Sequence, residues 1–467
     1  MSFIKKFVGD RAFYRKVLAV AVPIMVQNGI TNFVGLLDNI MVGRLGTESM
    51  SGVSIVNQFI FIFNLLIFGA ISAAGIFTAQ YHGLGDTEGE RYTFRFKLLI
   101  NVIAAVLGIV AFAAFDDQLI SLFLHDGSLE GNLALTLSEG KAYLLVMLFG
   151  LIPYALSQVY ASTMRETEQT VVPMVASLIA VAVNFVGNLL LIFGMLGLPA
   201  LGVTGAAIAT VISRFVELLV LVIWGHTHKS VCPYLRRAYR SLHIPRTLFF
   251  RIALKGLPLM ANELFWATAI TLRNQCYSTR GLDVVAAQNI CSTVFNVFNV
   301  VYMAIGCSIA IIVGNLLGAG KLEEARDTDR KMMAFSVTCS AVMAILLIAT
   351  SGLFPLLYKT EPSVRSLATY MIIICAATTP FSAFAHSAYF TLRSGGKVMI
   401  TLLFDSVYMW VLVLPISAIL AYLTPLNIHW LFALCQCTEI IKTIFGWVLL
   451  RRGTWVRQLV ADKALKN

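Results

Sequence analysis

Among the acidic side chains inside the long apolar runs of this sequence, where a charge is costly, three stand out. Asp38 is the one formally charged residue between Val17 and Val42, and Glu263 and Asp405 interrupt two later runs. A carboxylate at the centre of a membrane helix costs roughly 2.5–3.5 kcal/mol on insertion scales, so such a group normally faces a protein interior or a watery cavity. The three acids therefore predict ion-coupling sites that bind a proton or another cation.

Two asparagines accompany Asp38. Asn184 and Asn188 are four residues apart in the segment NFVGN, so they share one face of a helix. At about 1.5 Å of rise per residue, Asn188 comes to a depth comparable with that of Asp38. A carboxylate with carboxamides is an oxygen-rich setting for H⁺ or Na⁺. The alternative is that these asparagines only join neighbouring helices.

Glu263 and Asp405 lie at similar distances from the starts of their helices, so they come to about the same depth in the membrane. A shared site is therefore geometrically allowed. The alternative is that each accepts hydrogen bonds from nearby backbone or from Asn262. We expect Na⁺, if it is the coupling ion, at Asp38 or Glu263, and we expect no other metal and no cofactor. Residues that we expect to line a cavity for organic substrates are Asn28, Asn64, Trp266, Asn299 and Tyr302.

Two further charged pairs are spaced three residues apart on expected helices. Arg214 with Glu217, and Glu439 with Lys442, are therefore interpreted as ion pairs within their own helices.

The composition is that of a polytopic membrane protein. The 467 residues are 58% hydrophobic and 13% charged, which a soluble chain of two or three domains could not accommodate. The net charge of +11 is therefore interpreted through membrane topology. A nucleic-acid binder would gather its basic residues on a polar domain, and we find none.

Twelve runs are long enough to span a bilayer, which takes about 20 residues. Most of the 35 Lys and Arg residues fall in loops on one side of these runs, and by the positive-inside rule that side is the cytoplasm. With an even number of helices, both termini lie there. The runs lie near residues 17–42, 53–81, 98–115, 142–163, 171–196, 202–225, 256–278, 284–317, 333–357, 367–392, 398–423 and 428–450.

The second half of the sequence repeats the first at an offset of 235 residues. Ordered agreement of Gly, Pro, Asn and loop charges is much rarer by chance than identity between two apolar helices. The matched pairs include Pro23 and Pro258, Gly46 and Gly281, Asn64 and Asn299, Gly83 and Gly318, and Gly85 and Gly320.

The repeat predicts the architecture. Each half holds six helices, so both enter the membrane in the same direction and should be related by a pseudo-two-fold axis along the membrane normal. We expect an all-α integral membrane protein of two six-helix bundles, at residues 1–225 and 256–467, joined by a cytoplasmic linker at 226–255. A cavity between the halves and alternating access by rocking are the function that such a plan implies.

No enzyme motif competes with transport. The sequence has no HExxH, GxSxG, Walker-type lysine loop or CxxC pair, so we predict that the protein is not an enzyme. Two alternatives stay open, namely a flippase for lipid-linked sugars and a membrane receptor or scaffold. Intramembrane acids and an internal repeat speak against a scaffold, which needs neither.

Several motifs together resemble the multidrug and toxic compound extrusion (MATE) family. They are LLDNIMVGRLG, GLGD with its repeat GNLLGAGKLEEAR, GLPALGVTGAAIATVISR, LPLMANE and TLRSGGK, and the resemblance covers nearly the whole chain. The resemblance implies a bacterial inner-membrane antiporter, a monomer with small organic substrates, driven by H⁺ or Na⁺. Membrane lipid would be its surroundings and nucleic acid no partner.

The resemblance also carries site residues. The aspartate of the family's first helix matches Asp38, and the first asparagine of its fifth-helix pair matches Asn184. Asn188 stands where the DinF-like branch has an aspartate, and Glu263 corresponds to the NorM-like glutamate of the seventh helix. The NorM-like acid of the tenth helix is missing, with Ser382 near its place, and we expect Asp405 on the eleventh helix to substitute for it.

Overall fold

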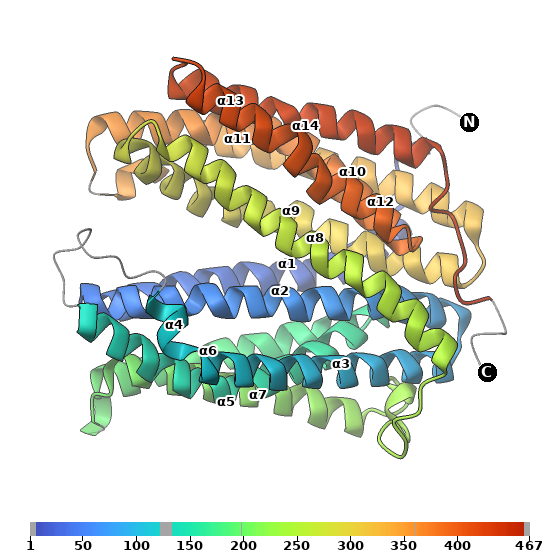
Figure 1. Cartoon of the computed structure of the whole chain (residues 1–467). Coiled ribbons are helices and arrows are strands. Elements are labelled where there is room, and N and C mark those ends of the chain that lie inside the picture. Colours follow the sequence, from blue (N-terminus) through green and yellow to red (C-terminus); the bar gives the residue numbers. More distant parts are fainter. Residues whose placement is uncertain (1–5, 122–132, 198, 359, 462–467) are drawn as a thin grey trace. The chain divides into compact units, whose positions relative to one another are not determined.

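A computed structural model describes residues 6–121, 133–197, 199–358 and 360–461 (Figure 1), and within these ranges the chain forms helices and no strands. In an α-helix the backbone N–H and C=O groups pair with one another, so they need no hydrogen-bond partners from the hydrocarbon, which has none. The long helices are α1 (Arg11–Gly43), α2 (Thr47–Leu84), α3 (Thr87–Ala114), α5 (Leu133–Glu166), α6 (Val171–Phe193), α7 (Gly202–Thr227), α8 (Arg246–Ser278), α9 (Leu282–Gly318), α10 (Leu322–Thr350), α11 (Pro362–Ser394) and α14 (Ile428–Arg451).

Shorter helices complete the described chain. Residues 398–422 form one span that begins as α12 (Val398–Leu402), continues through two π-helical stretches (Leu403–Val407 and Met409–Val413) and ends as α13 (Leu414–Tyr422). The remaining elements are α4 (Asp116–Ser121) and three 3₁₀ turns at Met195–Gly197, Pro233–Leu235 and Phe354–Leu357.

The twelve predicted spans are confirmed as helices. Eleven spans among the described residues are long and apolar enough to cross a membrane, and α8 is the twelfth, made more polar by Lys255, Glu263 and Arg273. Several helices reach further than the apolar runs, because their polar ends continue past the hydrocarbon. The helix that contains the predicted run near 98–115 thus begins at Thr87. The helix that contains the run near 333–357 ends earlier than the run, at Thr350.

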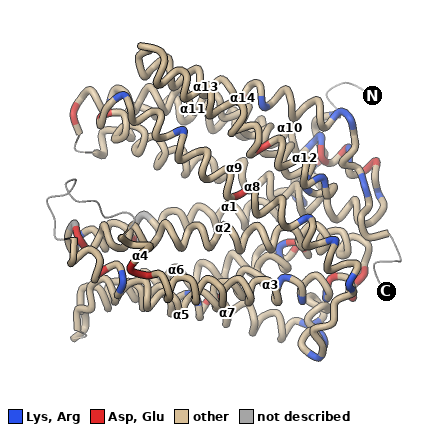
Figure 2. Tube along the Cα trace, in the orientation of Figure 1, with Lys and Arg blue, Asp and Glu red and all other residues tan. Residues whose placement is uncertain are grey.

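Charge follows the ends of the helices. In each part of the molecule Lys and Arg gather at one end of the bundle, and the middle stretches of the helices carry few charges (Figure 2). Asp38, Glu263 and Asp405 are among those few.

The repeat appears in the backbone of its turns. Gly85 and Gly320, which end α2 and α9, have φ values of +75° and +74°. In both turns the next residue donates its N–H to a carbonyl five residues back, Asp86 to Tyr81 and Lys321 to Leu316, each at 3.0 Å. This is the bonding of a left-handed helix cap, for which glycine is suited because it has no Cβ. The offset of 235 residues therefore preserves geometry as well as residue type.

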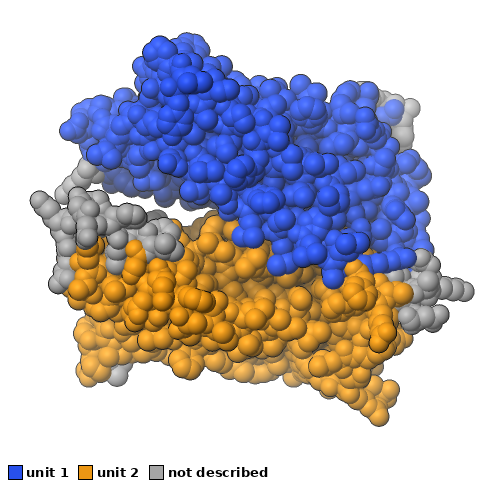
Figure 3. Space-filling view, viewed as in Figure 1, with its two compact units in different colours: residues 1–25, 79–86, 251–465 blue, residues 26–78, 87–250, 466–467 orange. Residues whose placement is uncertain are grey.

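The chain forms two compact units (Figure 3). Unit 1 comprises residues 1–25, 79–86 and 251–465, and unit 2 comprises 26–78, 87–250 and 466–467. The beginning of α1 and the end of α2 thus belong to the unit that holds the second half of the sequence. The division at 1–225, 226–255 and 256–467 remains a prediction about the repeat.

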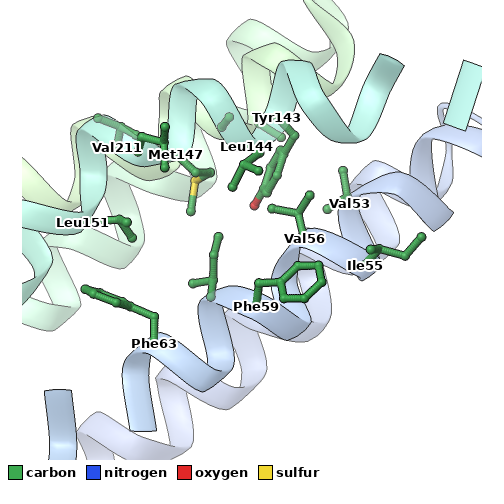
Figure 4. Close-up of a cluster of buried hydrophobic side chains, with 14 of the residues drawn as sticks. Val53, Ile55, Val56, Phe59, Phe63, Tyr143, Leu144, Met147, Leu151 and Val211 are labelled. Carbon is green, nitrogen blue, oxygen red and sulfur yellow. The ribbon is translucent and has the colours of Figure 1, made fainter. Parts of the chain in front are cut away.

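The core of unit 2 lies among α2, α5 and α7 (Figure 4). Large apolar side chains of α2 face those of α5, and Gly52 of α2 lies so close to α5 that a Cβ would come within 2.7 Å of the carbonyl oxygen of Thr136. Labelled members of this core are Val53, Val56, Phe59, Phe63, Tyr143, Leu144, Met147, Leu151 and Val211. Unit 1 has a corresponding core on α9, α11 and α14 that includes Val294, Met371 and Phe432.

The ends of α2 and α9 cross each other within unit 1. A Cβ on Gly83 would overlap the carbonyl oxygen of Asn315, and a Cβ on Gly318 would overlap that of Gln80. These four residues form two pairs at the offset of the repeat, so the contact is reciprocal. The side chain of Gln80 also accepts from the N–H of Leu459 at 2.6 Å, which ties the C-terminal segment to the crossing.

The linker is folded onto unit 2. Arg95 of α3 donates to the carbonyl oxygens of Ala238, His243 and Arg237 at 2.8, 3.0 and 3.0 Å. Cys232 is buried, and this burial raises the pKa of its thiol. The linker therefore has a defined path across the end of α3.

Candidate functional site

Asp38 lies five residues before the end of α1 and faces the two asparagines of α6. Asn188 donates through Nδ2 to Asp38 Oδ1 at 2.6 Å and to Asn184 Oδ1 at 3.3 Å. Asn184 in turn contacts Thr210 Oγ1 of α7 at 3.1 Å. The structure therefore brings together Asp38 and Asn188, which the sequence placed at one depth, and Asn184, which it placed on the same helix face, and adds Thr210 from a third helix.

The amide of Asn184 has a second orientation with more partners. Turned by a half rotation, its nitrogen lies 3.0 Å and 3.2 Å from the two Asp38 oxygens, while its oxygen accepts from Thr210. Which orientation holds is decided by the hydrogen bonds available, because oxygen and nitrogen are nearly alike in size. In this orientation both amides donate to Asp38, and the cluster (Asp38, Asn184, Asn188 and Thr210, called the N-cluster) stabilises an ionised carboxylate.

Burial makes these contacts strong. Asn188 is 1% exposed and Asn184 5% exposed, whereas Asp38 is half-buried. Hydrogen bonds to a carboxylate gain strength where water is excluded, and an unpaired charge there is costly. The N-cluster therefore stabilises the ionised form of Asp38 through its amide donors, and cation binding at Asp38 remains a prediction.

A second polar network lies on the same three helices together with α5 and was not predicted. Glu217 of α7 accepts from Ser177 of α6 at 2.6 Å and from Ser157 of α5 at 3.5 Å, and Gln27 of α1 donates to Ser177 at 2.8 Å. Ser177 and Asn184 are seven residues apart, so both networks lie along one face of α6.

The predicted ion pair of Arg214 with Glu217 is wrong. Among the described residues no salt bridge joins the two side chains, because each has a partner on another helix. Arg214 lies over the ring of Tyr154 at 4.5 Å, and Glu217 faces the serines. The three-residue spacing of Arg214 and Glu217 along α7 could not indicate these partners, because they lie on α5 and α6.

A second acidic cluster is built in unit 1 from α8, α11, the π-helical stretch Leu403–Val407 and α14. Asn262 donates to Asp405 Oδ2 at 3.1 Å and to the Tyr389 hydroxyl at 3.4 Å, and that hydroxyl donates to Glu263 Oε1 at 3.4 Å. Lys442 Nζ lies 2.7 Å from Asp405 Oδ1. Glu263 and Asp405 thus share a site, as their equal depth predicted, with Asn262 and Tyr389 between them. We call these five residues the C-cluster.

The C-cluster is positioned by irregular helix. Asp405 lies in the π-helical stretch Leu403–Val407, and such stretches are rare and frequent at functional sites. The neighbouring Ser406 donates to both the backbone oxygen and the side-chain oxygen of Asn262, at 2.7 and 2.8 Å. Asn262 is therefore held with its amide nitrogen toward Asp405.

The predicted pair of Glu439 with Lys442 is also wrong. Lys442 is bonded to Asp405, and Glu439 accepts from Ser382 at 3.3 Å. Ser382 is the residue that stands near the missing acid of the tenth helix. Contacts of α14 with α11 and with the π-helical stretch Leu403–Val407 determine these pairs, and spacing along one helix does not reveal them.

The residues expected to line a substrate cavity lie in both units. Asn64 and Asn299, which the repeat aligns, each have a buried side-chain oxygen without a hydrogen-bond partner in the described structure. Tyr302 is buried and meets His386 edge to face at 5.4 Å. Trp266 is partly buried against Tyr408, and Asn28 is half-buried on α1. These five residues remain predictions.

Three members of the two clusters were missed by the sequence analysis, namely Thr210, Tyr389 and Lys442. Each lies on a helix far along the chain from the acid that it serves. Lys442 carried a signal, because a lysine inside an apolar run needs an anionic partner just as an aspartate needs a donor. Thr210 and Tyr389 belong to residue types that are common in such helices, so they carried none.

The model of the MatE family matches residues 23–190 and 260–423, which is more than half of the chain. A probable multidrug resistance protein, NorM of Thermotoga maritima, is 22% identical over 455 residues, covering 96% of this chain and 94% of that protein.

Solved structures share the fold. An outward-facing multidrug resistance MATE family transporter of the MOP superfamily has a TM-score of 0.84 at 18% identity, covering 100% of this chain and 99% of the other. A variant of the Vibrio cholerae MATE transporter VcmN has a TM-score of 0.85 at 17% identity, covering 98% and 99%. The agreement extends over both halves of the chain.

Proposed function

The chain belongs to the MatE family of multidrug efflux transporters, and from that premise we propose that it is an ion-coupled antiporter of small organic molecules. Substrate from the cytoplasm binds between the two halves, and alternating access releases it outside. Inward movement of H⁺ or Na⁺ through the two clusters resets the cycle. We place the protein in the bacterial inner membrane as a monomer with both termini in the cytoplasm.

The observation that carries this proposal is the N-cluster. Asp38 is a carboxylate within a membrane helix that meets two buried amides and no Lys or Arg in the described structure. A purely structural acid at such a place would be expected to have a basic partner. An acid held by neutral donors can instead exchange a proton or Na⁺, and that exchange changes the net charge of the site.

The C-cluster supports a second contribution to coupling. Glu263 accepts from the neutral hydroxyl of Tyr389, while Asp405 has Lys442 beside it. A substrate that is an organic cation would compete with the coupling ion for the same negative charge, which is the simplest basis for exchange. Aromatic groups nearby, such as Trp266 and Tyr302, would add cation–π attraction for such a substrate.

Export in proteoliposomes tests the proposal. Purified protein is reconstituted, a fluorescent organic cation is supplied, and uptake or release is followed under an imposed pH or Na⁺ gradient. We expect gradient-driven movement with the unaltered chain, and a loss of at least about tenfold with Asp38→Asn, since the amide cannot exchange a proton. Glu263→Gln should reduce the rate as well.

Asp117→Asn is the matched control. Asp117 is a carboxylate on α4 with a side chain that is 56% exposed and paired with Lys141, so its loss should leave transport unchanged. If Asp38→Asn transports as fast as this control, Asp38 is not the coupling residue. If no gradient drives any cation, the antiporter proposal fails and movement of a lipid-linked sugar becomes the hypothesis to test.

A further inference from the structure

Lys442 occupies the place at Asp405 that a free cation would otherwise take. Its ammonium lies 2.7 Å from Asp405 Oδ1, and the two side chains are only 11% and 17% exposed. It also lies over the ring of Phe404 at 5.5 Å, a favourable position for a cation. A buried ion pair of this kind is fixed, because removing either partner leaves an uncompensated charge.

The other oxygen of Asp405 is occupied too. Asn262 donates to Oδ2 at 3.1 Å, and Ser406 keeps the Asn262 oxygen turned away by donating to it at 2.8 Å. Hard cations bind through several oxygen atoms at once, and an amide nitrogen or an ammonium is no ligand for them. An amide donates to Asp405 as amides do to Asp38, and what distinguishes Asp405 is the ammonium of Lys442, whose positive charge repels a metal ion.

The charges of the cluster lead to the same conclusion. Asp405 and Lys442 neutralise each other, so a Na⁺ entering beside Asp405 would bring a second positive charge close to the ammonium. Coulomb repulsion between two such charges is strong in a partly buried site, where the effective dielectric constant is low. The N-cluster differs, since Asp38 meets neutral amides there.

We propose that Lys442 is a tethered cation which occupies Asp405 and thereby excludes Na⁺ from the C-cluster, making it a specificity-determining residue for the coupling ion. This inference rests on the proposed function, in which the acidic clusters handle the coupling ion. It implies that any Na⁺ bound by the protein is bound at the N-cluster. It also implies that Glu263 is the one C-cluster acid that can exchange a proton during transport.

Binding of radioactive ²²Na⁺ to the purified full-length protein tests the proposal without any gradient. All variants carry Asp38→Asn, so that the N-cluster contributes nothing. We expect no saturable binding in this parent. Lys442→Met should create saturable binding by uncovering Asp405, and adding Asp405→Asn to it should abolish that binding. Lys442→Arg keeps a cation at the site and should bind no Na⁺.

Thermal unfolding provides the second measurement and controls for folding. Lys442→Met leaves a bare carboxylate and should lower Tm, and added NaCl should raise Tm again relative to choline chloride, since a ligand that binds only the folded state stabilises it. The double variant Lys442→Met with Asp405→Asn removes both charges, so its Tm should stay near that of the parent and be insensitive to Na⁺. Lys442→Gln is used if the methionine variant does not fold.

Two results would overturn the proposal. One is saturable ²²Na⁺ binding in the Asp38→Asn parent that disappears with Glu263→Gln or Asp405→Asn, because Na⁺ would then enter the C-cluster with Lys442 in place. The other is a folded Lys442→Met or Lys442→Gln variant that gains no binding and no Na⁺-dependent rise in Tm. Neither result depends on transport, so they are distinguishable from a failure of the proposed antiport.

Discussion

The shortest hydrogen bond to Asp38 comes from Asn188 and contributes most to stabilising its carboxylate. Asn188 Nδ2 lies 2.6 Å from its Oδ1, and Asn188 is almost completely buried. A hydrogen bond to a charged group contributes roughly 1.5–3 kcal/mol. A difference of that size decides how readily the carboxylate takes up and gives back a cation, so the amide matters to coupling almost as much as the acid.

Replacing Asn188 by Ala should therefore slow transport without unfolding the protein. We expect the gradient-driven rate to fall roughly tenfold, because the loss of about 1.5–3 kcal/mol from the ionised state unbalances uptake and release. The rate is measured in the same proteoliposomes. Asn39→Ala, one residue beyond Asp38 on α1, is the control and should keep most of the activity. An Asn188→Ala variant as fast as that control would remove Asn188 from the site.

The sequence predicted the acids and amides of the two clusters better than it predicted their cations. Depth along a helix follows from counting residues, so Asp38 with Asn188, and Glu263 with Asp405, could be brought together in advance. The partner of Lys442 depends on which faces of α12 and α14 meet, and the π-helical turns around Asp405 change that face. No periodicity in the sequence marks those turns.

At the scale of elements, buried polar pairs and glycine contacts hold helices together. Lys97 of α3 is fully buried and is paired with Glu166 of α5, and it also donates to Ser162 and Thr163 at 3.0 and 3.1 Å. Hydrophobic packing is weak as a force between helices in lipid, so such contacts determine which helices are neighbours.

The variant Lys97→Met should destabilise the protein strongly. It leaves Glu166 buried without its ion-pair partner, which costs about 3–5 kcal/mol, whereas Lys97→Met with Glu166→Gln should recover part of the loss. Thermal unfolding in detergent measures both. Lys321→Met removes an exposed pair with Glu324, whose side chains are 60% and 55% exposed, and should change stability by less than about 1 kcal/mol. Equal Tm values for Lys97→Met and Lys321→Met would contradict this prediction.

The crossing of α2 and α9 should tolerate no side chain. In Gly83→Ala or Gly318→Ala the new Cβ overlaps a backbone carbonyl of the other helix, which cannot move aside as a flexible side chain can. We expect each variant to lose roughly 1–3 kcal/mol of stability, as overpacked cores do, and to express poorly. Gly352→Ala is the control, because nothing lies within 4 Å of a Cβ at that position. Unchanged Tm values for both crossing variants would show that the helices separate at little cost.

At the scale of the whole molecule, the distribution of Lys and Arg predicts the orientation in the membrane. The linker carries several basic residues and no acidic ones between His226 and Lys255. The loops on the opposite side carry few basic residues. The twelve helices and their order followed from run lengths alone. The offset of 235 residues also anticipated the matching turns at Gly85 and Gly320, because glycine with positive φ leaves a mark in the sequence. No residue type or spacing in the sequence indicates that residues 1–25 and 79–86 belong to unit 1.

The orientation can be checked with single cysteines. In a background without the eight native cysteines, a cysteine at Arg44 should react with a membrane-impermeant maleimide in intact cells, because this exposed residue ends α1 on the predicted outer side. A cysteine at Arg240, exposed in the linker, should react only in inverted vesicles. The opposite pattern would place both termini outside.

The make-up of unit 1 has a consequence for the continuity of the polypeptide. Residues 1–25 and 79–86 come from the first half of the sequence, yet Val17, Val20 and Ile24 share a core with Ala304 and Ile309, and Gln80 is bonded to Leu459. The first half of the sequence thus contributes two segments, 1–25 and 79–86, to the unit formed mainly by the second half, much as subunits do in a domain-swapped dimer. A break in the linker would leave these noncovalent attachments intact, so the two halves can be regarded as complementary fragments that need no peptide bond to recognise each other.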